Sequence, residues 1–196
     1  DMAACIRHLL SETGISESEI VSIGIGTPGC IDTEKGMLIF AGNFKYGKNV
    51  NYREEMAKHF SLPVYIGNDA NVAALGEARA GAAKGVKNAI MITLGTGVGG
   101  GIIIDGKVFS GFNYAGGELG HTVIEKDGRP CSCGRRGCWE AYSSATGLIA
   151  MTKDKIQECR AKGTHTLMEK LICGDLNRIS GKTAFTAAKE GDAAGR

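Results

Sequence analysis

Residues 116–140 read GGELGHTVIEKDGRPCSCGRRGCWE, the stretch of the chain that is richest in candidate metal ligands. One histidine and three cysteines within it follow the spacing H-x9-C-x-C-x4-C; they are His121, Cys131, Cys133 and Cys138. Three thiolates and one imidazole are the ligand set of a closed, four-coordinate zinc site. We expect a structural zinc ion here, because four protein ligands leave no coordination position for a substrate or for a catalytic water.

Two other interpretations of these cysteines stay open, namely disulfide bonds or buried thiols beside an unrelated histidine. Cys131 and Cys133 are too close in sequence for an easy bridge, which favours zinc over a disulfide. The chain has seven cysteines and neither a signal peptide nor a long apolar stretch. This pattern indicates the reducing conditions of the cytoplasm.

Two acidic residues flank the zinc motif. Glu118 precedes His121 by three residues, and Glu140 follows Cys138 by two. Carboxylates on a rigid loop are suited to accept hydrogen bonds from sugar hydroxyls. Alternatively, each is an ordinary surface acid, or Glu140 begins a helix, where negative charge is favourable.

The composition is that of a globular protein with an apolar core. The 196 residues are 43% hydrophobic and 22% charged, with a net charge of +2. No basic run and no alternation of basic and aromatic residues occurs, which argues against nucleic acid and membrane surfaces as partners of this chain.

Alternating strands and helices predict an α/β protein. Apolar, β-branched runs at 20–26, 64–67, 89–94 and 102–104 predict strands. Residues 30–41 are expected to form a hairpin, followed by a polar loop, and Asp105-Gly106 a two-residue hairpin turn. Helices are expected over 2–13, 51–60, directly after Asp69, over 144–159 and 164–173, and from 182 onward.

Asp69 stands at the end of a predicted strand, immediately before a predicted helix. Aspartate is a good helix N-cap, so capping alone could explain it. A helix needs only one cap, however, and Asn68 or Asn71 could provide it. We therefore favour a functional carboxylate that is directed into a cleft at the strand end.

Residues 95–101, GTGVGGG, are expected to form a glycine-rich turn between two strands. Such a turn exposes backbone N–H groups that can surround phosphate oxygens. It is no P-loop, because it lacks Gly-Lys-Ser/Thr and a following helix. We expect Gly97→Val to weaken nucleotide binding and to leave sugar binding largely intact.

Taken together, the motifs resemble the ROK family of sugar kinases and repressors, most closely its bacterial glucokinases. The matching stretches are GIGTPG at 24–29, GNDANVAALGE at 67–77, LGTGVGGG at 94–101, GGELGH at 116–121 and CSCGRRGCWE at 131–140. The resemblance implies an actin-like, ribonuclease-H-like fold of two domains with a structural zinc loop. Residues 1–66 would complete the small N-terminal domain, and residues 67–196 would belong to the large domain.

Two parts of the family pattern have no counterpart in this sequence, namely a DxGGT phosphate hairpin near the N-terminus and a C-terminal nucleotide-binding segment. We therefore expect a longer protein of which this chain, by itself, is inactive.

The resemblance also implies residue roles. Asp69 would be the general base, and sugar contacts would come from Gly29, Asn43, Asn68, Asp69, Glu118, His121 and Glu140. The nucleotide phosphates, with Mg²⁺, would lie against Gly95, Thr96, Gly97, Gly99 and Gly100. Zinc would be held by the four residues of the H-x9-C-x-C-x4-C motif.

The implied reaction is ATP-dependent phosphorylation of glucose to glucose 6-phosphate, a step of glycolysis, by a cytoplasmic homo-oligomer (dimer or tetramer). Alternatives are a kinase for an N-acetylhexosamine or fructose, or a sugar-sensing transcriptional regulator whose DNA-binding domain would precede residue 1. The intact Asp69 and the glycine-rich turn favour the enzyme, because a sensor needs neither a base nor phosphate binding.

Overall fold

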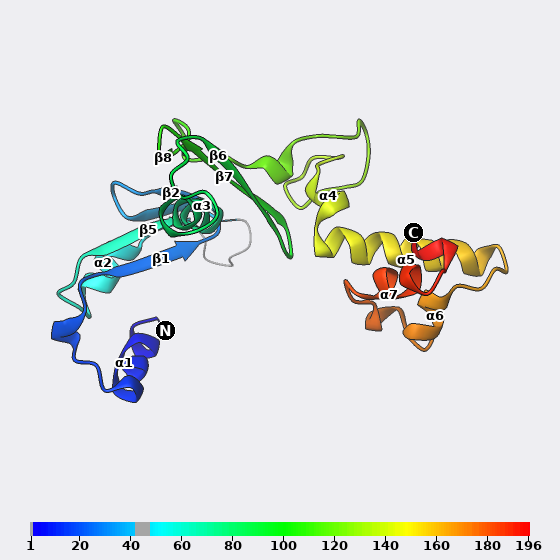
Figure 1. Ribbon diagram of the computed structural model, residues 1–196, viewed down its shortest axis with the longest axis horizontal. Helices are drawn as coiled ribbons and strands as arrows, with labels where there is room; N and C mark the ends of the chain where they lie inside the picture. The colour runs from blue at the N-terminus through cyan, green and yellow to red at the C-terminus, as the bar shows by residue number, and fades with distance from the viewer. Residues whose placement is uncertain (1, 42–47) are drawn as a thin grey trace. The chain divides into compact units, whose positions relative to one another are not determined.

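The computed structural model describes residues 2–41 and 48–196 (Figure 1). Its contacts divide the chain into two compact units, the first comprising residues 1–91 and 100–117 and the second 92–99 and 118–196. The expected division between residues 66 and 67 falls inside a strand of the first unit. That division concerns the domains of the whole protein and stays a prediction.

A short parallel sheet forms the centre of the first unit. Strand β1 (Ile23–Thr27) pairs with β5 (Val64–Asn68), and Thr27 lies opposite Asn68, so both strands end at the same edge. Helix α3 (Asp69–Ala80) contacts both strands. An apolar core joins this sheet to α1 (Met2–Thr13) and α2 (Tyr52–Ala57). The buried residues of this core are Ala3, Ile23, Met56, Phe60 and Val64.

The predicted hairpin over 30–41 is confirmed as β2 (Cys30–Asp32) and β3 (Met37–Phe40). A polar loop is expected after this hairpin. That prediction is wrong at residues 48 and 49, which belong to strand β4 (Lys48–Asn51), the strand that pairs with β3. The sequence KNVN has too little apolar character to predict a strand, and its pairing partner β3 decides its conformation. Asn43 lies outside the described residues.

The glycine-rich turn is shorter than expected. Strand β6 (Ala89–Leu94) ends before it, and β7 (Val98–Ile104) begins at Val98, so only residues 95–97, called here the glycine turn, connect the two. The later glycines belong to β7, and packing explains one of them: a Cβ at Gly101 would lie 2.4 Å from the Ala74 Cβ atom of α3.

The two-residue turn at Asp105-Gly106 is confirmed. It connects β7 to β8 (Lys107–Val108), and Ile104 lies opposite Lys107. Both turn residues have positive φ angles, +51° and +75°, as a type I′ hairpin turn requires.

The second unit ends in a group of helices, drawn yellow to red in Figure 1. They are α4 (Glu140–Ser143), α5 (Ala145–Ala161), α6 (Leu167–Leu171) and α7 (Thr183–Lys189), with short 3₁₀ turns at Leu119–His121, Leu176–Arg178 and Ala193–Gly195. The last three helices enclose an apolar core of Ile156, Met168, Ile172, Ile179, Ala184 and Ala187. The helices expected over 144–159, 164–173 and from 182 are thus confirmed.

Among residues 2–41 and 48–196, the helices are all too short or too polar to cross a membrane. The cytoplasmic location inferred from the cysteine content stays a prediction.

Candidate functional site

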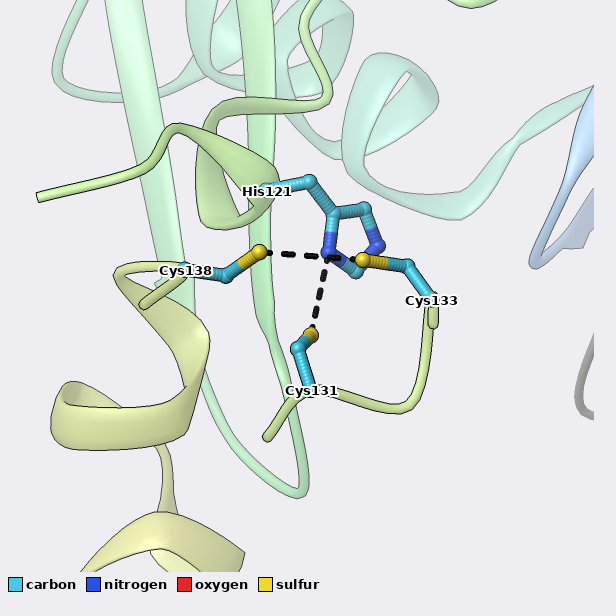
Figure 2. Close-up of side chains that lie close together, drawn as sticks. All are labelled: His121, Cys131, Cys133 and Cys138. Atoms are coloured by element: carbon cyan, nitrogen blue, oxygen red, sulfur yellow. Dashed lines mark hydrogen bonds between the residues drawn. The ribbon is translucent and has the colours of Figure 1, made fainter. Parts of the chain in front are cut away.

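Residues 121–138, called here the cysteine loop, bring the four predicted metal ligands together (Figure 2). All four ligand atoms lie within 4.8 Å of one another. Cys131 Sγ is 3.6 Å from His121 Nδ1, and Cys133 Sγ is 3.6 Å from Cys138 Sγ. Zinc–ligand bonds near 2.3 Å in a tetrahedron place the ligand atoms about 3.8 Å apart. The four side chains therefore fit a tetrahedral zinc ion, and all of these cysteines are free thiols rather than disulfides.

The surroundings of Cys133 and Cys138 shift the pKa values of their thiols in opposite directions. Burial raises the pKa of Cys138 to about 11, and hydrogen bonds with Cys133 and Cys131 add to this effect. Burial also raises the pKa of Cys133, but hydrogen bonds from the backbone N–H and the guanidinium of Arg135 outweigh it and bring that pKa to about 6. A metal ligand must be deprotonated, and the surroundings of Cys133 favour its thiolate more than those of Cys138 do.

Backbone hydrogen bonds fold the cysteine loop back on itself. Ile124 N donates to Gly137 O over 2.8 Å, Gly137 N donates to Arg129 O over 2.7 Å, and Cys131 N donates to Arg135 O over 2.9 Å. These bonds bring both ends of the H-x9-C-x-C-x4-C motif to the same place, as its spacing predicts.

Glu140, the first residue of α4, connects the cysteine loop to the glycine turn. Its Oε2 accepts a 3.0 Å hydrogen bond from Val98 N, the residue that follows the turn. Its Oε1 accepts one from Ser132 Oγ over 3.2 Å and lies 3.8 Å from Cys131 Sγ. Glu140 begins a helix, as one interpretation of the sequence held, but its side chain is half-buried and bound on two sides.

The contact between Glu140 and the glycine turn changes the expectation for Gly97. A Cβ atom at Gly97 would lie 2.4 Å from Glu140 Oε2. Substituting Gly97 must therefore move a carboxylate predicted to bind sugar, so we expect it to affect sugar binding as well as nucleotide binding. At Gly95, in contrast, a Cβ would meet none of the described atoms within 4 Å.

Glu118 directly precedes the 3₁₀ turn Leu119–His121, and His121 is the last residue of that turn. Glu118 is exposed, and the described residues offer its carboxylate no hydrogen-bond donor. His121 directs Nδ1 toward Cys131. With Nδ1 on a metal, the proton resides on Nε2, which can then donate to another ligand.

In the first unit, Asn68 is the N-cap of α3. Asn68 Oδ1 accepts from Asn71 N over 3.1 Å, and Asn68 Nδ2 donates to Gly29 O over 3.2 Å. The alternative in which Asp69 caps the helix is therefore wrong. The Asp69 carboxylate is exposed and accepts only a 2.8 Å bond from the adjacent Ala70 N within the described chain.

A cavity of about 440 Å³ adjoins this strand edge and is lined in part by Asn68, Asn71, Ser110 and Tyr114. Asn71 is 8% exposed, and its Oδ1 is the buried side-chain atom of the described residues that lacks a hydrogen-bond partner. The first unit thus groups Gly29, Asn68 and Asp69, whereas Glu118, His121 and Glu140 belong to the second, and each group is described within its own unit.

Sequence reasoning missed two contacts of the second unit, those of Ser132 with Glu140 and of Thr146 with Thr96 O, the latter 2.7 Å long. Thr146 and Thr96 are 50 residues apart. No local sequence pattern indicates a contact between residues so far apart. The predicted start of a helix at residue 144 correctly indicates a helix N-terminus near Thr146, but not its partner.

Comparisons with known proteins show what this chain is similar to. The family model described as the ROK family matches residues 1–195. The glucokinase of Halalkalibacterium halodurans is 38% identical over 98% of this chain and 57% of its own length. The xylose repressor of Bacillus subtilis is 36% identical over 89% of this chain and 45% of its own length. The chain thus spans about half to three fifths of these curated relatives.

Two solved structures are similar along nearly the whole chain. A ROK family glucokinase from Streptomyces griseus in complex with glucose and AMPPNP is 33% identical, with a TM-score of 0.77, and covers 98% of this chain and 61% of that protein. A ROK family transcriptional regulator, homologous to the E. coli MLC protein, is 28% identical, with a TM-score of 0.79. This match covers 99% of this chain and 46% of the regulator. The α/β fold is confirmed, and the actin-like architecture is consistent with these neighbours. By motifs, fold and sequence match, this chain belongs to the ROK family.

Proposed function

We propose that this protein is a sugar kinase that transfers phosphate from ATP to a hexose, converting glucose to glucose 6-phosphate. The observation that carries the proposal is the exposed Asp69 carboxylate at the carboxyl end of β5. Because Asn68 caps α3, helix capping does not account for Asp69. The glucokinase relatives and the glucose complex of the similar structure support the choice of sugar.

In the proposed reaction Asp69 accepts the proton of the attacking 6-hydroxyl as general base. Asn68, Gly29 and Asn43 contribute contacts to the sugar from the first unit. Glu118, His121 and Glu140 bind further hydroxyls, with Glu118 as acceptor and His121 Nε2 as donor. Phosphoryl transfer depends chiefly on positioning and on neutralisation of charge, and these residues do the positioning.

The proposal assigns the nucleotide phosphates to the backbone of Gly95, Thr96 and Gly97, together with Gly99 and Gly100 of β7. Mg²⁺ bound with ATP would neutralise phosphate charge. His121, Cys131, Cys133 and Cys138 would hold zinc, which supplies cross-links within the cysteine loop. That loop in turn positions Glu140 through Ser132, which donates to its carboxylate.

We extend the proposal to the architecture of the whole protein. It would have the two-domain actin-like fold, divided between residues 66 and 67, and would assemble as a dimer or tetramer. The xylose repressor and the regulator structure favour a second candidate, a sugar-sensing transcriptional regulator.

The deciding experiment incubates the purified whole protein with MgATP and, separately, glucose, fructose, N-acetylmannosamine or xylose. Sugar phosphates are detected by mass spectrometry, and sugar affinities are measured by calorimetry. We expect glucose 6-phosphate together with stoichiometric ADP. Tight sugar binding without phosphorylation of any of the four sugars would contradict the kinase and favour the regulator.

A further inference from the structure

The carbonyl groups of the glycine turn are held by the start of α5. Gly95 O accepts a 2.8 Å hydrogen bond from Ala145 N. Thr96 O accepts a 2.7 Å bond from Thr146 Oγ1. Both donors lie in the first turn of the same helix, so two successive carbonyls of the turn are directed toward α5.

This arrangement fixes the N–H groups on the other side of the turn. In a trans peptide the C=O and N–H groups point in opposite directions, and the described chain has no cis peptide bond. The N–H groups of Thr96 and Gly97 therefore point away from α5. None of the described residues accepts a hydrogen bond from either group, and Thr96 is exposed. Two successive N–H groups with a common direction can bind an anion together.

The Thr146 hydroxyl is itself held in place. Ser144 Oγ lies 2.9 Å from Thr146 Oγ1 and accepts from Gly147 N over 3.0 Å as the N-cap of α5. Because a carbonyl cannot donate, the Thr146 proton goes to Thr96 O, and Ser144 must donate to Thr146. Ser144 is only 1% exposed, so its side chain is held in place by its surroundings and in turn orients the Thr146 hydroxyl.

We propose that Thr146 is a positioning residue for phosphate binding: its hydroxyl holds the peptide of Thr96 so that the Gly97 N–H faces the nucleotide phosphates. The inference rests on the proposed kinase function and names a residue through which the glycine turn acts. Thr146 itself touches no phosphate in this arrangement. Its contribution is to orient the peptide before the ligand arrives, which lowers the ordering cost of binding.

The test compares Thr146→Val, which lacks the hydroxyl at nearly the same shape, with Thr146→Ser, which keeps it. AMPPNP with Mg²⁺ and glucose are titrated separately by calorimetry into the whole protein. We expect Thr146→Val to raise the Kd for AMPPNP roughly 3- to 10-fold, the range for one net hydrogen bond. The glucose Kd should stay within about twofold, and Thr146→Ser should restore nucleotide affinity.

Thr152→Val is the matched control, because the Thr152 hydroxyl bonds to Leu148 O inside α5 and does not contact the turn. It should leave AMPPNP affinity unchanged. Thr146 is exposed, so valine is tolerated there, and Thr146→Ala gives a second variant without the hydroxyl.

Unchanged AMPPNP affinity in both Thr146→Val and Thr146→Ala would overturn the inference alone. An equal loss of glucose and AMPPNP affinity would also overturn it, since that pattern indicates a general structural role. A wild-type protein that binds no AMPPNP would overturn the proposed function and this inference with it, so the two failures are distinguishable.

Discussion

The cysteine loop and the helices α5, α6 and α7 belong to the same unit, yet they differ in how much apolar surface they bury. The helices enclose an apolar core in which Ile156 is fully buried. In the loop, Val123 and Ile124 are 48% and 56% exposed, and the buried side chain is that of a predicted metal ligand, Cys138. Too little apolar surface is buried there to offset the entropy of an ordered loop. We therefore expect the cysteine loop to depend on a bound metal and the helices on apolar packing.

The largest expected effect is that of Cys133→Ser, which removes one ligand. Zinc binding energy at a structural site is folding energy, so the loop should lose its order and the protein several kcal/mol of stability. Elemental analysis should find about one zinc per chain in the wild type and none in the variant. Cys5→Ser, which changes an exposed cysteine of α1, is the control and should keep the metal. A wild-type protein without zinc would contradict the metal assignment.

The second prediction concerns the other side of the comparison. Ile156→Ala leaves a cavity in the helical core and should lower the free energy of unfolding by about 2–5 kcal/mol in urea titration. The exposed Ile124→Ala in the cysteine loop should change it by less than about 0.5 kcal/mol. Zinc content should stay at the wild-type level in both variants. Loss of zinc in Ile156→Ala would show that the loop depends on the apolar core after all.

The glycine turn, which is hydrogen-bonded to the start of α5 and lies beside Glu140, gives the third prediction. Gly97→Ala should displace Glu140 from Val98 N and weaken sugar and nucleotide binding together, each roughly tenfold, as expected for loss of a hydrogen bond to a charged group. In Gly95→Ala the new Cβ atom contacts none of the described residues. It should therefore weaken nucleotide binding, by obstructing the approach of phosphate to the turn, and leave sugar binding unchanged. Calorimetric titration with glucose and with AMPPNP measures both. Identical behaviour of the two variants would contradict the role given to Glu140.

The sequence predicts the cysteine loop better than the glycine turn, for a physical reason. Metal ligands within one short segment are readable from their spacing, because the side chains themselves determine the geometry. The extent of the turn depends instead on partners far along the chain: α3 explains Gly101 in β7, and Glu140 explains Gly97. Strand β4 escaped prediction in the same way, because its partner β3, rather than its own residues, makes it a strand.

The smallest expected effect concerns Asp192, which connects the start of α6 to the 3₁₀ turn at Ala193–Gly195. Burial raises the pKa of Asp192, but hydrogen bonds from the Thr166 hydroxyl and from the backbone N–H groups of Ala194, Leu167 and Met168 outweigh it and lower that pKa. Asparagine keeps one acceptor oxygen but loses the other and the charge, so Asp192→Asn should cost about 1 kcal/mol at neutral pH.

The pH dependence of this effect follows from the lowered pKa. The contribution of Asp192 is fully present above its unfolded pKa, about 3.9, and is lost as pH falls through the lower folded value. The difference in Tm between wild type and Asp192→Asn should thus be constant from pH 7 to about 5 and shrink at lower pH. A difference that persists unchanged at pH 2–3 would show that the carboxylate charge is not what stabilises this contact.

The most direct test of the kinase account is kcat of the whole protein carrying Asp69→Asn, measured with glucose and MgATP. Asparagine keeps the shape of aspartate but accepts no proton at neutral pH, and Asn68 still caps α3. The account predicts a fall in kcat of about 10²–10⁴-fold with the glucose Kd and Tm nearly unchanged. Turnover at the wild-type rate in this variant would contradict it and would leave the proposed kinase without its base.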